Sequence, residues 1–521
     1  MTSSPPGVDS TKLGRDVFVV AGVVVLGAIM SILDVTVVAV AQPTFMSTFD
    51  TSAAGAAWSM TGYTLALAAV IPVSSWAASR FGTKRVYMAS LVLFLIGSVL
   101  CALAWNIGSL VAFRVIQGFG GGLLMPIGMM IMTRAAGPER VGSVMAVLGI
   151  PMLLGPIMGP ILGGWLIEIA SWHWVFLINV PIGIIALVYA FMALPGDDQE
   201  PGKKIDIPGL LMLSPGLALF LFGVSSSADE RTFNAPRVYI PMIIGAALIA
   251  TFVWHALRAK HPLLDLRLFR NPTLRIAIIT MSLFAIAFFG ASLLYPQYFI
   301  VVRGETTLMA GLLLAPQGLG AMLTMPIAGK MTDKIGPGKF VLVGLVLIAI
   351  GVGMFISLGT DTSYWYLCGA LLIQGLGMGM TMMPIMSAAL ATVRPSEIAD
   401  GSTLMNAIQQ TASSVGTAVI TVIFTTMLLP LSRAMMQAGG DPEKTMNAMV
   451  ENGVNVKDPV AVGQAGQSTL ADIASTYGDT FIIATILVAL TLIPAFFLPR
   501  KKMEVHTDVE TREEKVLDPL G

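Results

Sequence analysis

The sequence alternates long apolar runs with short polar segments over almost its whole length. A run of about 20 apolar residues forms a helix long enough to cross the roughly 30 Å hydrocarbon core of a bilayer. Fourteen such runs cover residues 17–40, 56–78, 86–104, 109–133, 142–167, 174–194, 208–228, 238–257, 276–299, 308–329, 340–358, 364–388, 402–429 and 480–499. The pattern therefore predicts an all-α polytopic membrane protein with 14 transmembrane helices.

The composition agrees with this pattern and excludes several classes of function. Of the 521 residues, 55% are hydrophobic and 12% are charged, whereas a soluble domain has about 25% charged residues. The 30 basic and 30 acidic residues cancel, so no overall field indicates a nucleic-acid partner. The sequence contains neither the zinc motif HExxH nor the phosphate-binding motif GxxxxGK[ST], so we expect no metal site, no cofactor and no ATP-driven pump.

The basic residues between the runs are distributed unevenly. Assigning successive loops to alternate sides places 23 lysines and arginines on one side and six on the other. Cytoplasmic loops carry the excess of such residues. The distribution predicts that both termini are cytoplasmic, as an even number of spans requires.

An internal repeat divides the chain into two similar halves. The segment that begins IQGFGGG at Ile116 returns as IQGLGMG at Ile373, 257 residues later, and the loop glycine Gly82 returns as Gly336, 254 residues later. Such repeats are typical of secondary transporters, in which two bundles move around a central site. The predicted parts are a cytoplasmic tail (1–16), a six-helix bundle (17–194), a linker with two extra spans (195–275), a second six-helix bundle (276–499) and a cytoplasmic tail (500–521).

The second bundle contains a long polar stretch at 432–477, before the last span. Its sequence is rich in Gly, Asp, Asn and Gln. We expect an extracytoplasmic loop there, either mobile or folded as an interfacial hairpin, that contributes no chemistry.

Only two full charges lie inside the fourteen runs, Asp34 in the first and Arg114 in the fourth. Each would cost about 2.5–3.5 kcal/mol at the centre of a bilayer, so each should face a watery cavity or the other charge. Both lie some 8 Å below the outer boundary at about 1.5 Å per residue, and we expect them to pair. A purely structural ion pair remains an alternative, although the second half has Leu371 where the first has Arg114 and needs no charge there.

An acidic side chain in this position suits proton coupling. Dehydration favours the protonated carboxyl group, whereas a nearby arginine favours the ionised one, and a change of conformation alters both effects. If substrate binds best once the proton has left Asp34, the protein cannot carry proton and substrate at the same time, and it works as an antiporter.

Other residues of the spans indicate packing and contact with substrate less directly. The fifth run contains a stripe of small residues, Gly155, Gly159 and Gly163, with Pro156, which lets helices approach closely and is a candidate for gating. The uncharged polar residues of the helices have two equally good explanations, contact with substrate and hydrogen bonding between helices. The candidates for a substrate cavity are Gln117, Met125, Gln317, Asn406, Gln409 and Gln410.

These motifs resemble the major facilitator superfamily, and specifically its fourteen-span drug/proton antiporters of the EmrB/QacA type. Leu33 to Pro43, LDVTVVAVAQP, is similar to the first-span motif of that family, and Arg114 to Gly121, RVIQGFGG, is similar to its RxxQGxGG motif, whose arginine is associated with proton coupling. The GP-rich stripe of the fifth run resembles the antiporter motif. The resemblance covers essentially the whole chain and implies a bacterial inner membrane protein that works as a monomer on the proton motive force, without ATP.

The resemblance also implies an inner gate built on the loop motif GxLADRxGRKR. Its first copy keeps Arg80, Gly82, Lys84 and Arg85, but serines replace its first glycine (Ser75) and its aspartate (Ser79). The second copy keeps Gly329, Asp333 and Gly336. Asp333 is therefore expected to hold the halves together, with Arg80, Lys84 or Arg85 as candidate partners.

Three functions compete at this point. The first is a proton-driven exporter of amphipathic or cationic compounds. The second is an exporter of a native lipid, fatty acid or metabolite, for which drug efflux is incidental; whether a periplasmic adaptor takes part is open for both. The third, a membrane-embedded enzyme, needs a nucleophile or metal cluster at membrane depth, and the sequence contains no such group.

Overall fold

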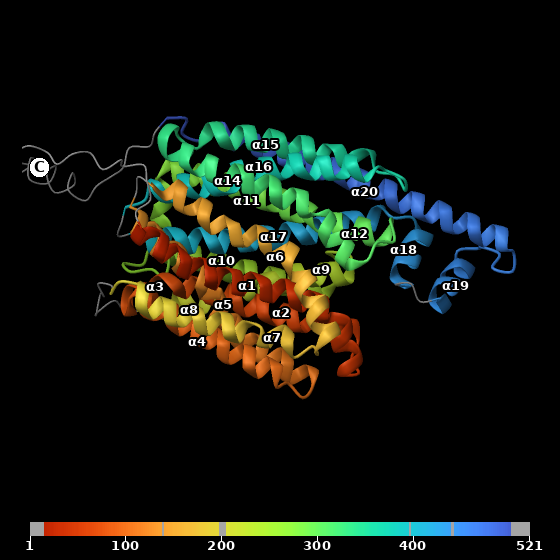
Figure 1. The fold of residues 1–521 in the computed structure, drawn as a ribbon, viewed down its shortest axis with the longest axis horizontal. Coiled ribbons are helices and arrows are strands. Elements are labelled where there is room, and N and C mark those ends of the chain that lie inside the picture. The colour runs from red at the N-terminus through yellow and green to blue at the C-terminus, as the bar shows by residue number, and fades with distance from the viewer. Residues whose placement is uncertain (1–14, 138–139, 197–204, 395–396, 439–441, 502–521) are drawn as a thin grey trace, which may run out of the picture.

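The computed structural model describes residues 15–137, 140–196, 205–394, 397–438 and 442–501, except for the side chains of a few residues inside helices. Over these residues the chain is a bundle of helices and has no strand. Figure 1 shows the long helices lying side by side, with the start of α1 and the end of α20 at the same end of the bundle. This end carries the basic loops and is called the basic end below.

The first half folds as predicted, with breaks where proline interrupts a run. Pro72 splits the second predicted span, because proline lacks an N–H and cannot continue the helix without strain. The helices are α1 (Arg15–Thr48), α2 (Ala53–Val70), η1 (Ile71–Val73), α3 (Ser74–Phe81), α4 (Thr83–Ala102), α5 (Ile107–Ala136), α6 (Val141–Ile169), α7 (Trp174–Leu177) and α8 (Asn179–Ala193).

The second half repeats this arrangement. Its helices are α11 (Pro272–Ser292), α12 (Leu294–Val301), α13 (Thr307–Leu313), α14 (Ala315–Ile335), α15 (Gly338–Gly353), η4 (Met354–Ser357), α16 (Tyr364–Ala391), α17 (Ile398–Met427), α18 (Pro430–Ala438), α19 (Pro442–Glu451) and α20 (Pro459–Ala495). Thirteen helical segments of the described chain are long and apolar enough to cross a membrane. The remaining predicted span, 142–167, coincides with α6, some of whose side chains lie outside the described residues.

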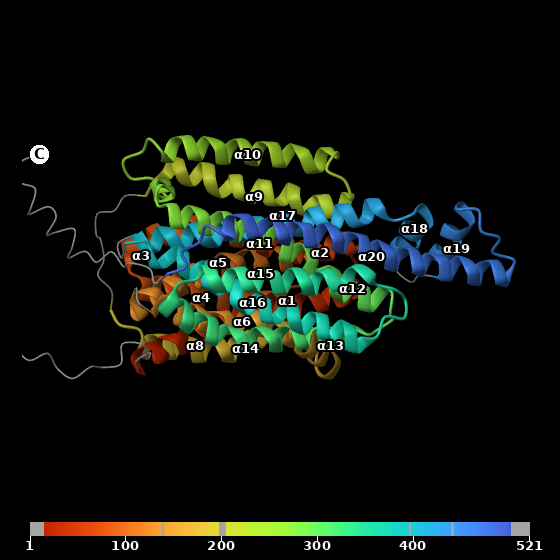
Figure 2. The same ribbon diagram turned by 90° about the horizontal axis from the view of Figure 1, so that it is seen from above.

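The linker contributes two more long helices, α9 (Ile207–Glu230) and α10 (Pro236–Ala256), and the short η3 (Leu266–Arg270). Helix α9 contacts both α2 of the first half and α17 of the second, whereas α10 packs mainly on α9 (Figure 2). The rings of Trp58 on α2 and Phe222 on α9 stack at 5.6 Å between centroids. The inserted pair therefore covers one seam between the halves.

The polar stretch before the last span differs from the expectation of a loop or hairpin. Helices α18 and α19 lie in it, and α20 begins at Pro459 instead of near residue 480 (Figure 1). The side chain of Asp458 accepts a hydrogen bond from the Val460 N–H and caps α20. Buried residues recur at helical spacing along its first part, at Thr469, Ile473 and Tyr477, and this period is hidden among polar neighbours.

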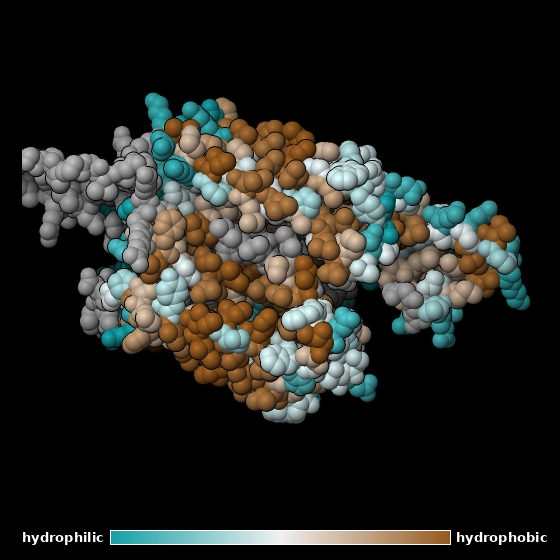
Figure 3. All heavy atoms as spheres, viewed as in Figure 1, coloured by the Kyte–Doolittle hydropathy of each residue, from teal (hydrophilic) through white to brown (hydrophobic). Residues whose placement is uncertain are grey.

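The outside of the bundle is apolar over its middle. Figure 3 shows hydrophobic atoms along the sides of the helices and hydrophilic ones gathered towards the two ends. On α14, for example, Leu319, Leu323 and Ile327 form an exposed stripe at four-residue spacing. An apolar belt of this kind is what a bilayer requires, and the prediction of an all-α polytopic membrane protein is confirmed.

Candidate functional site

The two intramembrane charges lie together, as predicted. An Arg114 Nη1–H donates to Asp34 Oδ2 over 2.5 Å, and both side chains are 0% exposed. Asn106 caps α5 by accepting a hydrogen bond from the Ser109 N–H, which fixes the start of the helix two turns before Arg114. The pair joins the middle of α1 to the first part of α5.

Further donors surround the Asp34 carboxylate. The side-chain amides of Gln117 and Asn179 donate to Asp34 Oδ1 over 2.8 and 2.9 Å. Both amides also donate to the Ser98 hydroxyl, over 2.7 and 3.3 Å. Helices α1, α4, α5 and α8 thus meet in one buried polar network, which we call the Asp34 network.

Arg114 is held on its other sides by α2 and by aromatic rings. Its Nε–H donates to the Ser59 carbonyl over 3.1 Å, and Nη1 also donates to Gln117 Oε1 over 2.7 Å. The guanidinium carbon lies 4.1 Å from the centre of the Tyr63 ring and 5.8 Å from that of Phe176, as in cation–π contacts. Within the described chain, Nη2 is buried and has no hydrogen-bond partner.

The Asp34 carboxylate and the Arg114 guanidinium depend on each other in this arrangement. Three donors point at Asp34, and a protonated carboxyl group would leave Arg114 buried without a counter-ion. Breaking a buried ion pair by neutralising one partner costs about 3–5 kcal/mol. Separation of the two charges therefore requires that the network rearranges or that water reaches Arg114.

Sequence reasoning placed Gln117 in the substrate cavity, but the structure places it in the Asp34 network with 0% exposure. It missed Asn179, Ser98 and Ser59 altogether. Asn179 could have been found, because it is an amide inside the predicted sixth span. Ser98 and Ser59 gave no such signal, since serine is common in membrane helices as a packing residue.

The glycine stripe of α6 packs against α1 beside Asp34. A methyl group added at Gly155 would collide with Ile32, and one added at Gly159 would collide with Thr36. Gly163 lies against the Val37 backbone. The stripe thus sets the distance between α6 and the helix that carries Asp34. The side chain of Pro156, the fourth residue of the predicted motif, lies outside the described residues.

At the basic end, Asp333 of α14 joins the second half to the first, with different partners from those expected. Its carboxylate accepts hydrogen bonds from the Gly142 N–H at 2.8 Å, the Ser143 N–H at 2.9 Å and the Ser143 hydroxyl at 2.7 Å. The acceptor therefore caps the N-terminus of α6, where free N–H groups and the helix dipole favour a negative charge.

The two helix backbones approach closely at this contact, because a Cβ at Gly329 would lie only 2.6 Å from the Gly142 carbonyl oxygen.

One of the expected basic partners, Lys84, contacts the end of α8. The Lys84 ammonium donates to the carbonyls of Phe191 and Leu194, at the end of α8, over 2.8 and 2.6 Å. Arg80 is in the last turn of α3 and Arg85 in the first turn of α4.

Gly82 separates these two helices, and it has the same left-handed backbone, φ 89°, as Gly336 in the second half. This equality supports the internal repeat.

A similar contact joins α3 of the first half to α17 of the second. Here the carboxylate belongs to α17, and the donor is a serine of α3. The Ser75 hydroxyl of α3 donates to Asp400 of α17, and the Ser74 and Thr403 hydroxyls lie 2.6 Å apart. Asp400 stands 257 residues after Ser143, the offset of the repeat. The carboxylate at this seam therefore comes from α17, and no sequence motif indicated it.

The remaining cavity candidates lie on α5, α14 and α17. Asn406 of α17 donates to the Met129 sulfur of α5 over 3.0 Å, which joins the two halves in mid-bundle. By helical spacing, Met125 lies one turn from Met129, and Gln410 one turn from Asn406. Gln409 is buried, and the Gln317 backbone packs against Gly375 of α16.

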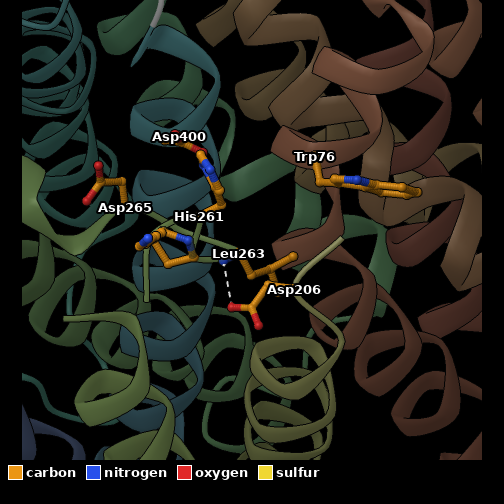
Figure 4. Close-up of a pocket in the computed structure, with 8 residues that line it drawn as sticks. Trp76, Asp206, His261, Leu263, Asp265 and Asp400 are labelled. Atoms are coloured by element: carbon orange, nitrogen blue, oxygen red, sulfur yellow. Dashed lines mark hydrogen bonds between the residues drawn. The ribbon is translucent and has the colours of Figure 1, made fainter. Parts of the chain in front are cut away.

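A small polar cavity of about 160 Å³ lies beside Asp400 (Figure 4). Trp76, His261, Asp265 and Asp206 also line it. Asp206 caps α9 and accepts hydrogen bonds from the Leu263 N–H at 3.0 Å and from His255 Nε2 at 2.9 Å. These bonds fasten the inserted helices to the loop that follows them, and the cavity is too small for an amphipathic drug.

Residues 24–417 match the family model described as Major Facilitator Superfamily. The chain belongs to the major facilitator superfamily. The resemblance seen in the motifs is thereby confirmed, and this facilitator is a membrane transporter and not an enzyme.

Relatives of this facilitator include proteins named for drug resistance. It is 48% identical over 500 residues to a protein of Mycobacterium tuberculosis named multidrug resistance protein B homolog, covering 92% of this chain and 90% of the relative. It is 29% identical to the putative multidrug resistance protein MdtD of Salmonella paratyphi A, covering 76% and 83%. The crystal structure of the human organic anion transporter MFSD10 shares the fold, with a TM-score of 0.58 and 15% identity over 91% of this chain and 100% of that one.

Proposed function

We propose that this facilitator is a proton-coupled exporter that expels amphipathic or cationic compounds in exchange for protons. Its similarity over nine-tenths of its length to a protein named for multidrug resistance supports the class of cargo. The excess of basic residues at one end supports an orientation with both termini in the cytoplasm, in a bacterial inner membrane.

The Asp34 network is the observation that carries the proposal. In the described part of the spans, this network contains a completely buried pair of opposite charges, Asp34 and Arg114. Groups from α1, α2, α4, α5 and α8 form the network. Any movement of α1 against α5 changes the number of donors on the carboxylate. A proton that enters along an inside-negative membrane potential supplies about 2.3 kcal/mol per 100 mV towards such a rearrangement.

The contacts at the basic end support alternating access between the halves. Asp333 on the N-terminus of α6 and Ser75 on Asp400 join the halves at two separate seams. In the proposed orientation both are cytoplasmic, so the structure is closed towards the cytoplasm. Export then requires these contacts to open while Asp34 carries the proton, which leaves to the cytoplasm as cargo enters from the inside.

No cofactor or ATP is needed in this scheme, because the proton motive force drives the exchange. The proposed partners are protons, amphipathic cargo and the lipid bilayer, and the proposed functional unit is a monomer.

The test is proton release on binding of substrate. Purified protein in detergent, with a weakly buffered pH dye, is challenged with the lipophilic cation ethidium. Wild-type protein should release protons, and Asp34→Asn should not, because the amide cannot carry the exchanged proton. Asp361→Asn, the same change at an exposed acid, is the matched control and should behave as wild type.

Two results would decide against the scheme. Equal proton release by Asp34→Asn would show that Asp34 is structural and that coupling occurs elsewhere. If ethidium bound without proton release even in the wild type, antiport of that cargo would be refuted, and export of a native lipid or metabolite would become the leading function.

A further inference from the structure

A large basic cavity opens at the basic end of the second half, apart from the Asp34 network and next to the small cavity at Asp400, with which it shares Asp265. Its volume is about 980 Å³, and it lies between η3 and the start of α11, the loop from α16 to α17, and the chain that follows α20. Its basic lining residues are Arg267, Arg270, Arg394, Arg500 and Lys501. Segments far apart in the sequence thus bring five positive charges to one site.

The described residues around the cavity do not neutralise these charges. Two acids, Asp265 and Glu397, also line the cavity, which leaves a formal charge of 5 − 2 = +3. Within the described chain, none of the five basic residues forms a salt bridge. Asp265 instead caps η3 by accepting a hydrogen bond from the Arg267 backbone N–H. Concentrated positive charge without counter-ions favours an anionic ligand.

The edge of the cavity borders the apolar belt. The end of α20 and the residues that follow it expose Ile493, Phe496 and Phe497, which are 61%, 58% and 66% accessible. The Arg500 guanidinium lies 4.0 Å from the centre of the Phe496 ring, so the cavity begins where the apolar surface ends. A soluble anion would gain nothing from this apolar margin, whereas an amphiphile would use both surfaces.

We propose that this cavity binds the headgroup of an anionic phospholipid. Its phosphate would lie among the arginines, and its acyl chains would follow the exposed face of α20. Basic pockets between membrane helices on the cytoplasmic side suit such headgroups. Because Arg270 belongs to the linker and Arg394 to the second half, the lipid fastens the linker to that half. The proposal concerns a permanent lipid contact, so it holds whatever the cargo is.

The test measures lipid binding to the full chain. Delipidated protein in detergent is titrated with dioleoyl-phosphatidylglycerol and, separately, with dioleoyl-phosphatidylcholine, and bound lipid is counted by native mass spectrometry. The double variant Arg270→Gln/Arg394→Gln should weaken phosphatidylglycerol binding roughly 30-fold, because each basic residue near an anionic lipid contributes about a factor of five. Binding of phosphatidylcholine should be weak and unchanged.

The matched control removes two equivalent charges outside the cavity. Arg275→Gln/Lys339→Gln neutralises two exposed residues at the same end, and it should retain wild-type phosphatidylglycerol binding. An equal loss in both double variants would refute a defined site. Competition by millimolar inorganic phosphate would show a site for soluble anions and overturn the lipid assignment. Residues 502–521 contain six acids and three bases and so form an acidic tail. Tight lipid binding that appears only after this tail is removed would also overturn the proposal of a permanent lipid contact. Elution at the wild-type volume on size exclusion confirms that each variant is folded.

Discussion

The contact of Asp333 at the basic end predicts a shift of the conformational equilibrium when its carboxylate is removed. In Asp333→Ala, the N–H groups of Gly142 and Ser143 and the Ser143 hydroxyl lose their common acceptor. All three bonds exist only while the two halves meet at this seam. Their loss therefore destabilises the closed arrangement and leaves the open one unaffected.

The magnitude follows from the three bonds. A hydrogen bond to a charged group contributes about 1.5–3 kcal/mol net, and water replaces part of it at this half-buried site. We take about 2–3 kcal/mol for the whole contact, which corresponds to a shift of about 30- to 150-fold towards the open arrangement. If the closed arrangement is more populated than the open one by less than this factor, it becomes the less populated of the two in the variant.

The assay is a distance distribution across the basic end. Spin labels at Arg134→Cys and Lys339→Cys, exposed positions of the first and second half, report the separation by double electron–electron resonance. The native cysteines, Cys101 and Cys368, are replaced first. Asp333→Ala should gain a population at longer distance, and Asp361→Ala, an exposed acid at the other end, should not.

A distribution for Asp333→Ala that coincides with that of the parent would refute the reasoning. It would mean that the seam is held by apolar packing and that the cap of α6 contributes nothing to closure. Asp400→Ala provides an independent check, because it removes the acceptor of Ser75 at the other seam. The same direction of shift is expected there.

Two further changes test the packing and the network around Asp34. Gly159→Val should slow transport and lower the unfolding temperature, because the new side chain collides with Thr36 and overpacking costs about 1–3 kcal/mol. Gly164→Val, which has open space around it, should change neither quantity. Transport and thermal-unfolding assays of the two variants check this. Gln117→Leu should reduce ethidium efflux from proteoliposomes roughly tenfold, because it removes a donor to Asp34. Gln374→Leu, the same change 257 residues later, should leave efflux near wild type, and equal effects of the two would contradict a special role for the network.

The sequence predicted the essential pair because a charge inside an apolar run is unambiguous. Asp34 and Arg114 had to find each other or water, and helical spacing already gave them equal depth. The same argument does not identify Ser59 or Ser98, because a serine in a membrane helix has a low free-energy cost and does not mark a site. It also misjudged the start of α20, where polar residues on the exposed face hid the buried period of Thr469, Ile473 and Tyr477.

The sequence by itself determined the class of the molecule, its spans, the repeat and the positions of the two intramembrane charges, because hydrophobic length and charge are properties of single segments. The tertiary structure alone decided which groups share a site. It placed Gln117 on Asp34 instead of on a cavity wall, gave Asp333 the N-terminus of α6 as its partner, and moved the acid of the other seam to Asp400. Those partners come from helices distant in sequence, and their contacts depend on how the helices pack, which no local pattern encodes.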